Sequence, residues 1–161
     1  MSIYIVIGSQ HDLEYAQQCA ELLKEFKIDY RIFVASAHRT PEKIDEILNL
    51  TEKNHIQLII AMAGFAAHLP GVLASRALCP VIGVPLDSSS LLGLDALFSI
   101  VQMPAGIPCA SVGIGRSGAK NAAILAAEIL GIHDESLRDR IKKYRDRMKE
   151  SIEKVNQELN S

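Results

Sequence analysis

The stretch YRIFVASAHRTPEKIDEIL, from Tyr30 to Leu48, changes character halfway along. Its apolar run over Arg31–Ala35 is typical of a strand. A helical pattern over Pro41–Lys53 follows, with Thr40 at the expected N-cap and Pro41 at the first helical position, where its missing N–H costs nothing. The stretch therefore predicts a strand, a tight polar turn and a helix in direct succession.

The same unit recurs along the chain. Further strands are predicted at Ile3–Ile7, Gln57–Met62, Val81–Val84 and Cys109–Ile114. Helices are predicted at Leu13–Phe26 (with Asp12 as N-cap), Leu69–Leu78, Leu94–Val101 and Ala119–Leu130. Alternation with short connections predicts an α/β protein with a central parallel sheet covered on both faces, a flavodoxin-like or Rossmann-like three-layer α/β/α sandwich.

Composition narrows the functional class. A chain of 161 residues with 48% hydrophobic residues fits one compact domain. The net charge of −2 creates no field for non-specific binding to nucleic acid or membranes. No apolar run reaches the ~18 residues of a membrane helix, and MSIYIVIGSQ lacks the basic segment of a signal peptide. Cys19, Cys79 and Cys109 are unpaired in spacing, which predicts a reduced, cytoplasmic protein without a disulfide framework or zinc site.

The segment Asp134–Leu159 is highly charged and carries a single apolar stripe. Such a stripe predicts a long helix that covers a surface, either of its own domain or of another subunit, and the pattern does not decide between the two. The stripe consists of Leu137, Ile141, Tyr144, Met148, Ile152, Val155 and Leu159.

Polar residues gather where the predicted strands end. Ligands of open α/β sheets bind beyond the carboxyl ends of the strands. GSQHD (Gly8–Asp12) follows the first strand and offers a hydroxyl and free helix N–H groups to an anion. Asp12 is expected to accept from sugar hydroxyls, to cap its helix, or to do both.

The turn SAHRTP, residues 36–41, is the richest candidate site. Arg39 can bind phosphate through two parallel hydrogen bonds, and Ser36 adds a hydroxyl beside the positive end of the helix. His38 can move a proton near neutral pH. A polar corner is the alternative, but a second polar loop on a neighbouring strand favours a ligand site. In AGFAAHLPG, residues 63–71, small residues surround His68, which alone would more often be structural.

GIGRSG (Gly113–Gly118) formally matches the dinucleotide fingerprint G-x-G-x-x-G. It lies in the last strand–helix unit rather than the first, which argues against a dinucleotide. The glycines are expected instead to allow close packing and to leave a helix N-terminus free for an anion or a subunit contact. The sequence has no Walker A motif, which argues against a P-loop ATPase, and no metal-ligand spacing, which argues against a metal site. No acidic residue ends the first or third predicted strand, which argues against a receiver domain.

Taken together, these segments resemble a known family. GSQHD, SAHRTP, AGFAAHLPG, PVIGVPLDSSSLLGLD, SIVQMPAGIP and GRSGAKNAAILAAEIL occur in the same order as in the PurE family of purine biosynthesis. The resemblance covers roughly Ile3 to Leu130, with a family-like helical tail. It implies a flavodoxin-like catalytic domain over residues 1–132 and a C-terminal helix over 133–161 that packs on neighbouring subunits. It also implies a homo-octamer with sites at subunit interfaces.

The resemblance further implies N5-carboxyaminoimidazole ribonucleotide mutase chemistry without metal, nucleotide or organic cofactor. In this reaction a carboxylate moves from the exocyclic nitrogen to C4 of an imidazole. The family pattern makes His38 the general acid/base and puts His68 on a loop that closes over the base. The substrate ligands would be Ser9, Ser36 and Arg39 for phosphate, Asp12 for ribose, and Gly64, Leu69 and His11 as further contacts.

Arg39 and the intact AAHLPG indicate the mutase class, since the class that carboxylates aminoimidazole ribonucleotide directly with carbon dioxide has Lys in place of this Arg. The chain departs from the family pattern at three positions: His11 replaces Ser, Phe65 replaces Gly and Asp87 replaces Gln. Direct carboxylase, a non-catalytic sensor of a phosphoribosyl ligand and, more distantly, a dinucleotide oxidoreductase remain as alternatives.

Overall fold

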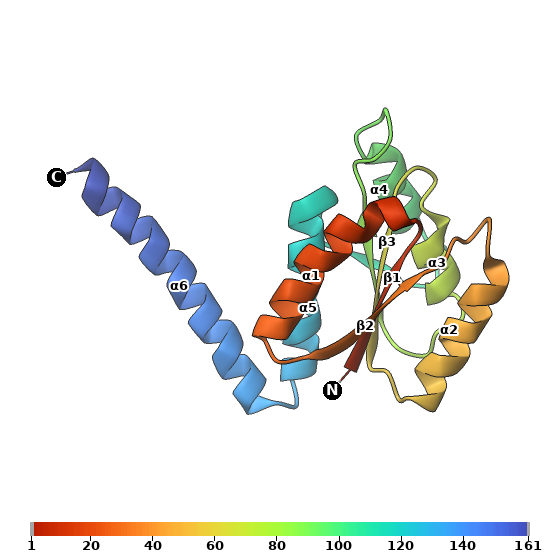
Figure 1. The fold of residues 1–161 in the computed structure, drawn as a ribbon, viewed down its shortest axis with the longest axis horizontal. Helices are drawn as coiled ribbons and strands as arrows, with labels where there is room; N and C mark the ends of the chain where they lie inside the picture. Colours follow the sequence, from red (N-terminus) through yellow and green to blue (C-terminus); the bar gives the residue numbers. More distant parts are fainter. Residues whose placement is uncertain (1, 161) are drawn as a thin grey trace.

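A computed structural model describes residues 2–160 of the chain. Strands and helices alternate from β1 to α5, and a last long helix follows (Figure 1). The strands are β1 (Ser2–Ile7), β2 (Asp29–Val34), β3 (Leu58–Ala63), β4 (Val81–Pro85) and β5 (Ala110–Ser111). The helices are α1 (Leu13–Glu25), α2 (Pro41–Lys53), α3 (His68–Ala74), α4 (Leu94–Val101), α5 (Gly115–Gly131) and α6 (Glu135–Leu159), with a 3₁₀ turn, η1, at Gln10–Asp12.

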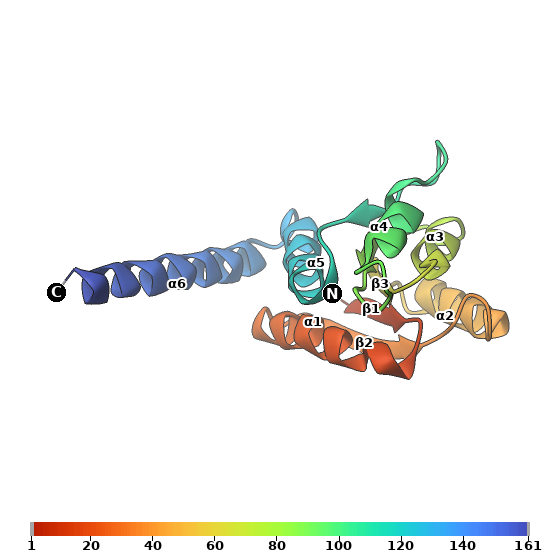
Figure 2. The same cartoon turned by 90° about the horizontal axis from the view of Figure 1, so that it is seen from above.

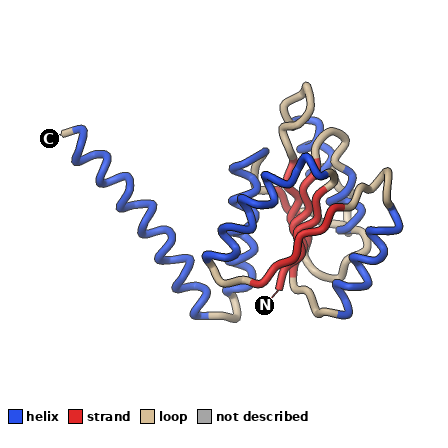
Figure 3. Tube along the Cα trace, viewed as in Figure 1, coloured by secondary structure: helices blue, strands red, loops and turns tan. Residues whose placement is uncertain are grey.

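The five strands form one sheet in the order β2-β1-β3-β4-β5, and every neighbouring pair is parallel (Figure 3). This is the flavodoxin-like strand order. The chain leaves β1 towards β2 on one side and returns to β3 on the other. The α/β class, the parallel sheet and the flavodoxin-like topology predicted from the alternating pattern are therefore confirmed.

Helices cover both faces of the sheet (Figure 2). Because strand side chains alternate, Ile3, Ile5 and Ile7 of β1 pack with α1 and α5. Tyr4 and Val6 of the same strand pack with α2, α3 and α4. Both faces of β1 are thus buried, which explains the continuous apolar run in its sequence.

The predicted fifth strand and last sheet-packing helix need correction. β5 has only two residues, and α5 begins at Gly115 rather than Ala119. Gly113 and Gly115 have φ values of +127° and +65°, which end the extended backbone and start the helix early. A Cβ on Gly118 would lie 2.1 Å from the carbonyl oxygen of Gly113. The expected close packing is confirmed at this contact.

The two predicted helix caps hold their positions but make no capping hydrogen bond from their side chains. The 3₁₀ turn η1 precedes α1, and Ser9, at the N-cap of that turn, accepts from the backbone N–H of His11 instead. The hydroxyl of Thr40 accepts from the backbone N–H of Ser36, at 2.9 Å. Thr40 therefore stabilises the turn after β2 rather than the first turn of α2.

Helix α6 is divided between two environments. Leu137 and Ile141 are buried against the α1–α5 face, and Arg140 Nε donates to the Phe26 carbonyl at 2.7 Å. Beyond these turns the helix leaves the body of the molecule (Figures 1 and 2). Tyr144 is partly buried beside Phe26, and the later stripe residues Met148, Ile152, Val155 and Leu159 are exposed. The first part therefore packs on its own domain, while packing of the rest on neighbours and the division at residue 132 stay predictions.

None of the helices within residues 2–160 combines the length and apolar character needed to cross a membrane. The three cysteines are free, and burial raises the pKa of the Cys19 thiol to about 12 and that of Cys109 to about 11. The cytoplasmic location inferred from their spacing stays a prediction.

Candidate active site

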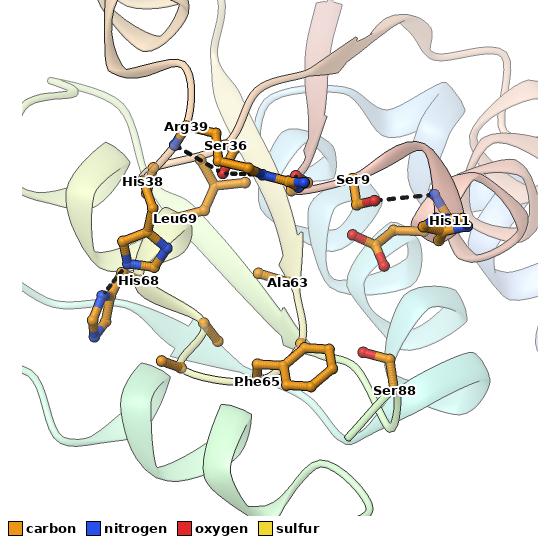
Figure 4. Close-up of a pocket in the computed structure, with 16 residues that line it drawn as sticks. Ser9, His11, Ser36, His38, Arg39, Ala63, Phe65, His68, Leu69 and Ser88 are labelled. Carbon is orange, nitrogen blue, oxygen red and sulfur yellow. Dashed lines mark hydrogen bonds between the residues drawn. The ribbon is translucent and has the colours of Figure 1, made fainter. Parts of the chain in front are cut away.

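A cavity of about 630 Å³ opens at the carboxyl edge of the sheet, where the loops after β1, β2, β3 and β4 meet (Figure 4). This is the switch point between β1 and β3, where chain connections diverge and leave a crevice. All nine residues singled out from the sequence line it: Ser9, His11, Asp12, Ser36, His38, Arg39, Gly64, His68 and Leu69. Their individual roles stay predictions.

The turn after β2 is held by its own hydrogen bonds. The backbone N–H of Thr40 donates to the Ser36 carbonyl at 3.0 Å, and the Arg39 backbone N–H donates to Ser36 Oγ at 3.3 Å. Arg39 Nε reaches the same hydroxyl at 3.4 Å. Since these contacts arrange the serine hydroxyl and the guanidinium before any ligand arrives, little ordering is left for binding.

The turn after β1 lies beside this arginine. The Gly8 N–H donates to the Met62 carbonyl at 3.1 Å, which fastens the turn to β3. Arg39 Nη2 donates to the Gly8 carbonyl at 3.4 Å. A guanidinium and two serine hydroxyls therefore line one cavity, and such donors suit an oxyanion such as phosphate.

Asp12 lies at the cavity wall and is only 6% exposed. Burial raises the pKa of its carboxyl, while the hydrogen bond from the Ser9 backbone and the nearby His11 and Arg39 lower it less. A buried carboxylate with spare acceptor capacity is suited to ligand hydroxyl groups. The ribose role predicted for Asp12 agrees with this environment.

Two imidazoles lie together at one end of the cavity (Figure 4). His38 Nε2 and His68 Nδ1 are 2.6 Å apart, and their ring planes meet at 68°. One of these two nitrogens must donate and the other accept, so a proton lies between the rings. The sequence alone does not decide whether His68 is structural or functional. The structure places it in hydrogen-bond contact with His38, the histidine that lies between Ser36 and Arg39 in the chain.

A family model described as AIR carboxylase matches residues 2–151. The chain belongs to the AIR carboxylase family. It is 54% identical over 145 residues to N5-carboxyaminoimidazole ribonucleotide mutase of Pyrococcus abyssi, covering 90% of this chain and 82% of that protein. It is 52% identical to the mutase of Saccharolobus solfataricus over 93% of this chain and 94% of that protein.

More distant AIR carboxylase relatives agree. Identity to the Escherichia coli mutase is 48%, over 89% of this chain and 85% of that protein. The crystal structure of Treponema denticola PurE superposes with a TM-score of 0.89 at 32% identity and covers 99% of each chain. The resemblance read from the sequence motifs is confirmed at the level of family and fold.

Two features of this AIR carboxylase site escape sequence reasoning. Ser88, after β4, lines the cavity, and a Cβ on Gly64 would lie 2.0 Å from its hydroxyl oxygen, so the loops after β3 and β4 touch. The run PLDSSS at a strand end was the available signal. Asp87, by contrast, faces away: it accepts from Tyr15 at 2.7 Å, which together with burial raises the tyrosine pKa to about 12.

No group of three or more His, Cys, Asp or Glu side chains that could hold a metal ion occurs within residues 2–160. The cavity offers hydrogen-bond donors, one carboxylate and paired imidazoles instead. These groups can bind an anion, orient hydroxyls and move protons.

We expect Asp12→Asn to raise the melting temperature at pH 7 by about 2 °C, because the amide carries no charge to desolvate. A carboxyl whose folded pKa is raised stabilises the fold only at acid pH and loses that contribution as pH rises through the folded pKa. The gain should therefore vanish near pH 3. Thermal melts at both pH values check this, with exposed Asp29→Asn as control; a lower melting temperature at pH 7 would contradict it.

Proposed function

We propose that this protein is N5-carboxyaminoimidazole ribonucleotide mutase, an isomerase of purine biosynthesis. The observation that carries the proposal is the pairing of an oxyanion cradle with a two-histidine proton site in one cavity. It occurs in a chain that shares about half of its residues with proteins of that name over most of its length. Its substrate is accordingly a ribonucleotide that carries a carbamate.

The cavity supports a specific orientation of that substrate. Ser9, Ser36 and Arg39 receive the phosphate, since all three line the cavity and Arg39 contacts both Ser36 and the loop after β1. The buried carboxylate of Asp12 accepts from ribose hydroxyls. The heterocycle then extends towards the imidazole pair, with Gly64 and Leu69 from the β3–α3 loop beside it and His11 near the phosphate.

His38 moves protons in two directions during the reaction. The carbamate C–N bond breaks, carbon dioxide leaves, and the electron pair remains on the nitrogen, which takes a proton from His38. C4 of the electron-rich aminoimidazole then attacks carbon dioxide, and His38 removes the C4 proton. The proton and electron count closes without a redox partner, and His68 can exchange a proton with His38 through their 2.6 Å hydrogen bond.

Two other functions compete with the mutase. A direct carboxylase would bind aminoimidazole ribonucleotide and carbon dioxide, but Arg39, not Lys, follows His38, and the relatives sharing about half of their residues with this chain are named mutases. A ligand sensor would need the phosphate-binding side chains but would not need a pair of histidines that can exchange a proton. The intact hydrogen bond between His38 and His68 favours an enzyme.

The decisive experiment supplies two substrates separately and follows the ultraviolet absorbance of the C4-carboxylated product. We expect product from the carbamate at low bicarbonate, and none at a comparable rate from aminoimidazole ribonucleotide with carbon dioxide. The reverse preference would identify a direct carboxylase. Tight binding without product from either substrate would identify a sensor.

We expect His38→Asn to lower turnover by about 10²- to 10⁴-fold, the usual contribution of a general acid/base. Affinity for aminoimidazole ribonucleotide, measured by calorimetry, should change little because the phosphate and ribose ligands remain. His55→Asn is the control, since His55 is exposed at the opposite edge, after α2. Near-normal turnover of His38→Asn would remove this histidine from the mechanism.

We also propose that the protein is a homo-octamer in which α6 contacts neighbouring subunits. Large apolar side chains are exposed on two helices, a feature of interfaces rather than of free surfaces. On α6 they are Met148, Ile152, Val155 and Leu159, and on α4 they are Leu94, Phe98 and Val101. Such an assembly brings one subunit's surface close to another's site, as the family resemblance implies.

Light scattering after gel filtration tests the assembly. We expect a mass of eight 17.6 kDa chains for the wild type and a smaller species for the double variant Ile152→Glu/Val155→Glu, which puts charge into the stripe. Gln157→Glu, on the opposite face of α6, should keep the wild-type mass. A monomeric wild type, or an unchanged mass for the double variant, would contradict the proposed role of α6.

A further inference from the structure

Phe65 has a backbone conformation that its side chain disfavours. Its φ of +53° lies in the left-handed region, where a bulky residue is an outlier. Lys27, His55 and Leu92 also have positive φ. Lys27 and His55 each directly follow the C-cap of a helix, where this conformation is common, and Leu92 lies in the turn before α4, away from the cavity lining. Phe65 ends no helix and stands between β3 and α3, so its strained backbone needs another explanation.

The ring of Phe65 does not compensate for this strain by burial. It is 62% exposed and lines the cavity. The backbone beside it is held in place, because Gly64 lies against the Ser88 hydroxyl and the Ala67 N–H donates to the Gly64 carbonyl at 3.1 Å. The chain therefore holds an apolar ring at the cavity wall rather than in the core.

The position of the ring relative to the other cavity groups is informative. Figure 4 shows Arg39 and Ser36 along one side of the cavity, Phe65 along another, and the imidazole of His38 at one end. Among the described residues that line the cavity, Phe65 carries the one aromatic ring that is not an imidazole. A ligand anchored at Arg39 that presents an edge to His38 would turn a flat face towards Phe65.

We propose that Phe65 is the stacking platform for the heterocycle of the ligand, and so selects ribose phosphates that carry an aromatic base. The proposal rests on the proposed function, which supplies the aminoimidazole ring. Stacking on an aromatic side chain contributes substantially to binding of a heterocycle and depends on the ring face alone. Strained backbone that is retained at a ligand site, and not relieved there, is typical of a positioning role.

Calorimetry with two ligands tests the proposal. Phe65→Ala should weaken binding of aminoimidazole ribonucleotide by about tenfold, the scale of one lost stacking contact, and leave binding of ribose 5-phosphate within about twofold. Arg39→Ala should weaken both ligands alike. Equal losses for both ligands in Phe65→Ala, or no loss for either, would overturn the stacking role.

Phe65→Gly separates the ring from the backbone strain. Glycine accepts positive φ freely, so this variant should melt above Phe65→Ala, yet bind aminoimidazole ribonucleotide as weakly. Recovery of wild-type affinity in Phe65→Gly would overturn the proposal, because backbone strain alone would then account for the effect.

The absence of tryptophan from the chain provides an independent reporter. The emission of Phe65→Trp should change on binding aminoimidazole ribonucleotide and not on binding ribose 5-phosphate. Leu78→Trp is the control, since Leu78 is 92% exposed and does not line the cavity. An unchanged Phe65→Trp emission, or an equal response to both ligands, would again overturn the stacking role.

Failure of the two proposals can be distinguished. A wild-type protein that neither binds aminoimidazole ribonucleotide nor forms product would overturn both. A wild-type protein that forms product while Phe65→Ala loses no base-dependent affinity would overturn the stacking role alone and leave the mutase in place.

Discussion

The structure depends on the parallel pairing of β1 with β2 on one side and β3 on the other. Parallel pairing brings the carboxyl ends of these strands to one edge, so their following loops must meet there. The hydrogen bond from Gly8 to Met62 continues that pairing just past the strands. The phosphate-type donors and the imidazole pair are neighbours because of this geometry, although 30 residues separate His38 from His68 in sequence.

Sequence patterns predicted much of the fold because the relevant forces are local or periodic. A continuous apolar run predicted β1 correctly, and Pro41 marked the start of α2. The fifth strand was overestimated, because apolar residues alone do not reveal where Gly113 and Gly115 turn the backbone. Where helix-cap residues bond was also not predictable, since Thr40 chooses between its helix and Ser36 only in three dimensions.

The candidate site shows the same division. Residue type and position at strand ends were enough to select the turn with Ser36, His38 and Arg39 and the loop Gly8–Asp12 in advance, and the family motifs added Gly64 and Leu69. Contacts between loops were not accessible in this way. Ser88 reaches the cavity because Gly64 has no side chain to exclude it, and Asp87, one position earlier, is held by Tyr15 instead. Both facts depend on how two loops from different strands meet.

The contact between Gly118 and the carbonyl of Gly113 has a consequence for sequence divergence. The atom that a side chain at position 118 would strike belongs to the backbone, so no substitution at position 113 can remove it. Position 118 is therefore restricted to glycine, and no second substitution at position 113 can relieve the clash. Descendants of this sequence should therefore retain glycine at 118 under selection for packing alone, and a glycine pattern that imitates a nucleotide fingerprint can persist without a nucleotide.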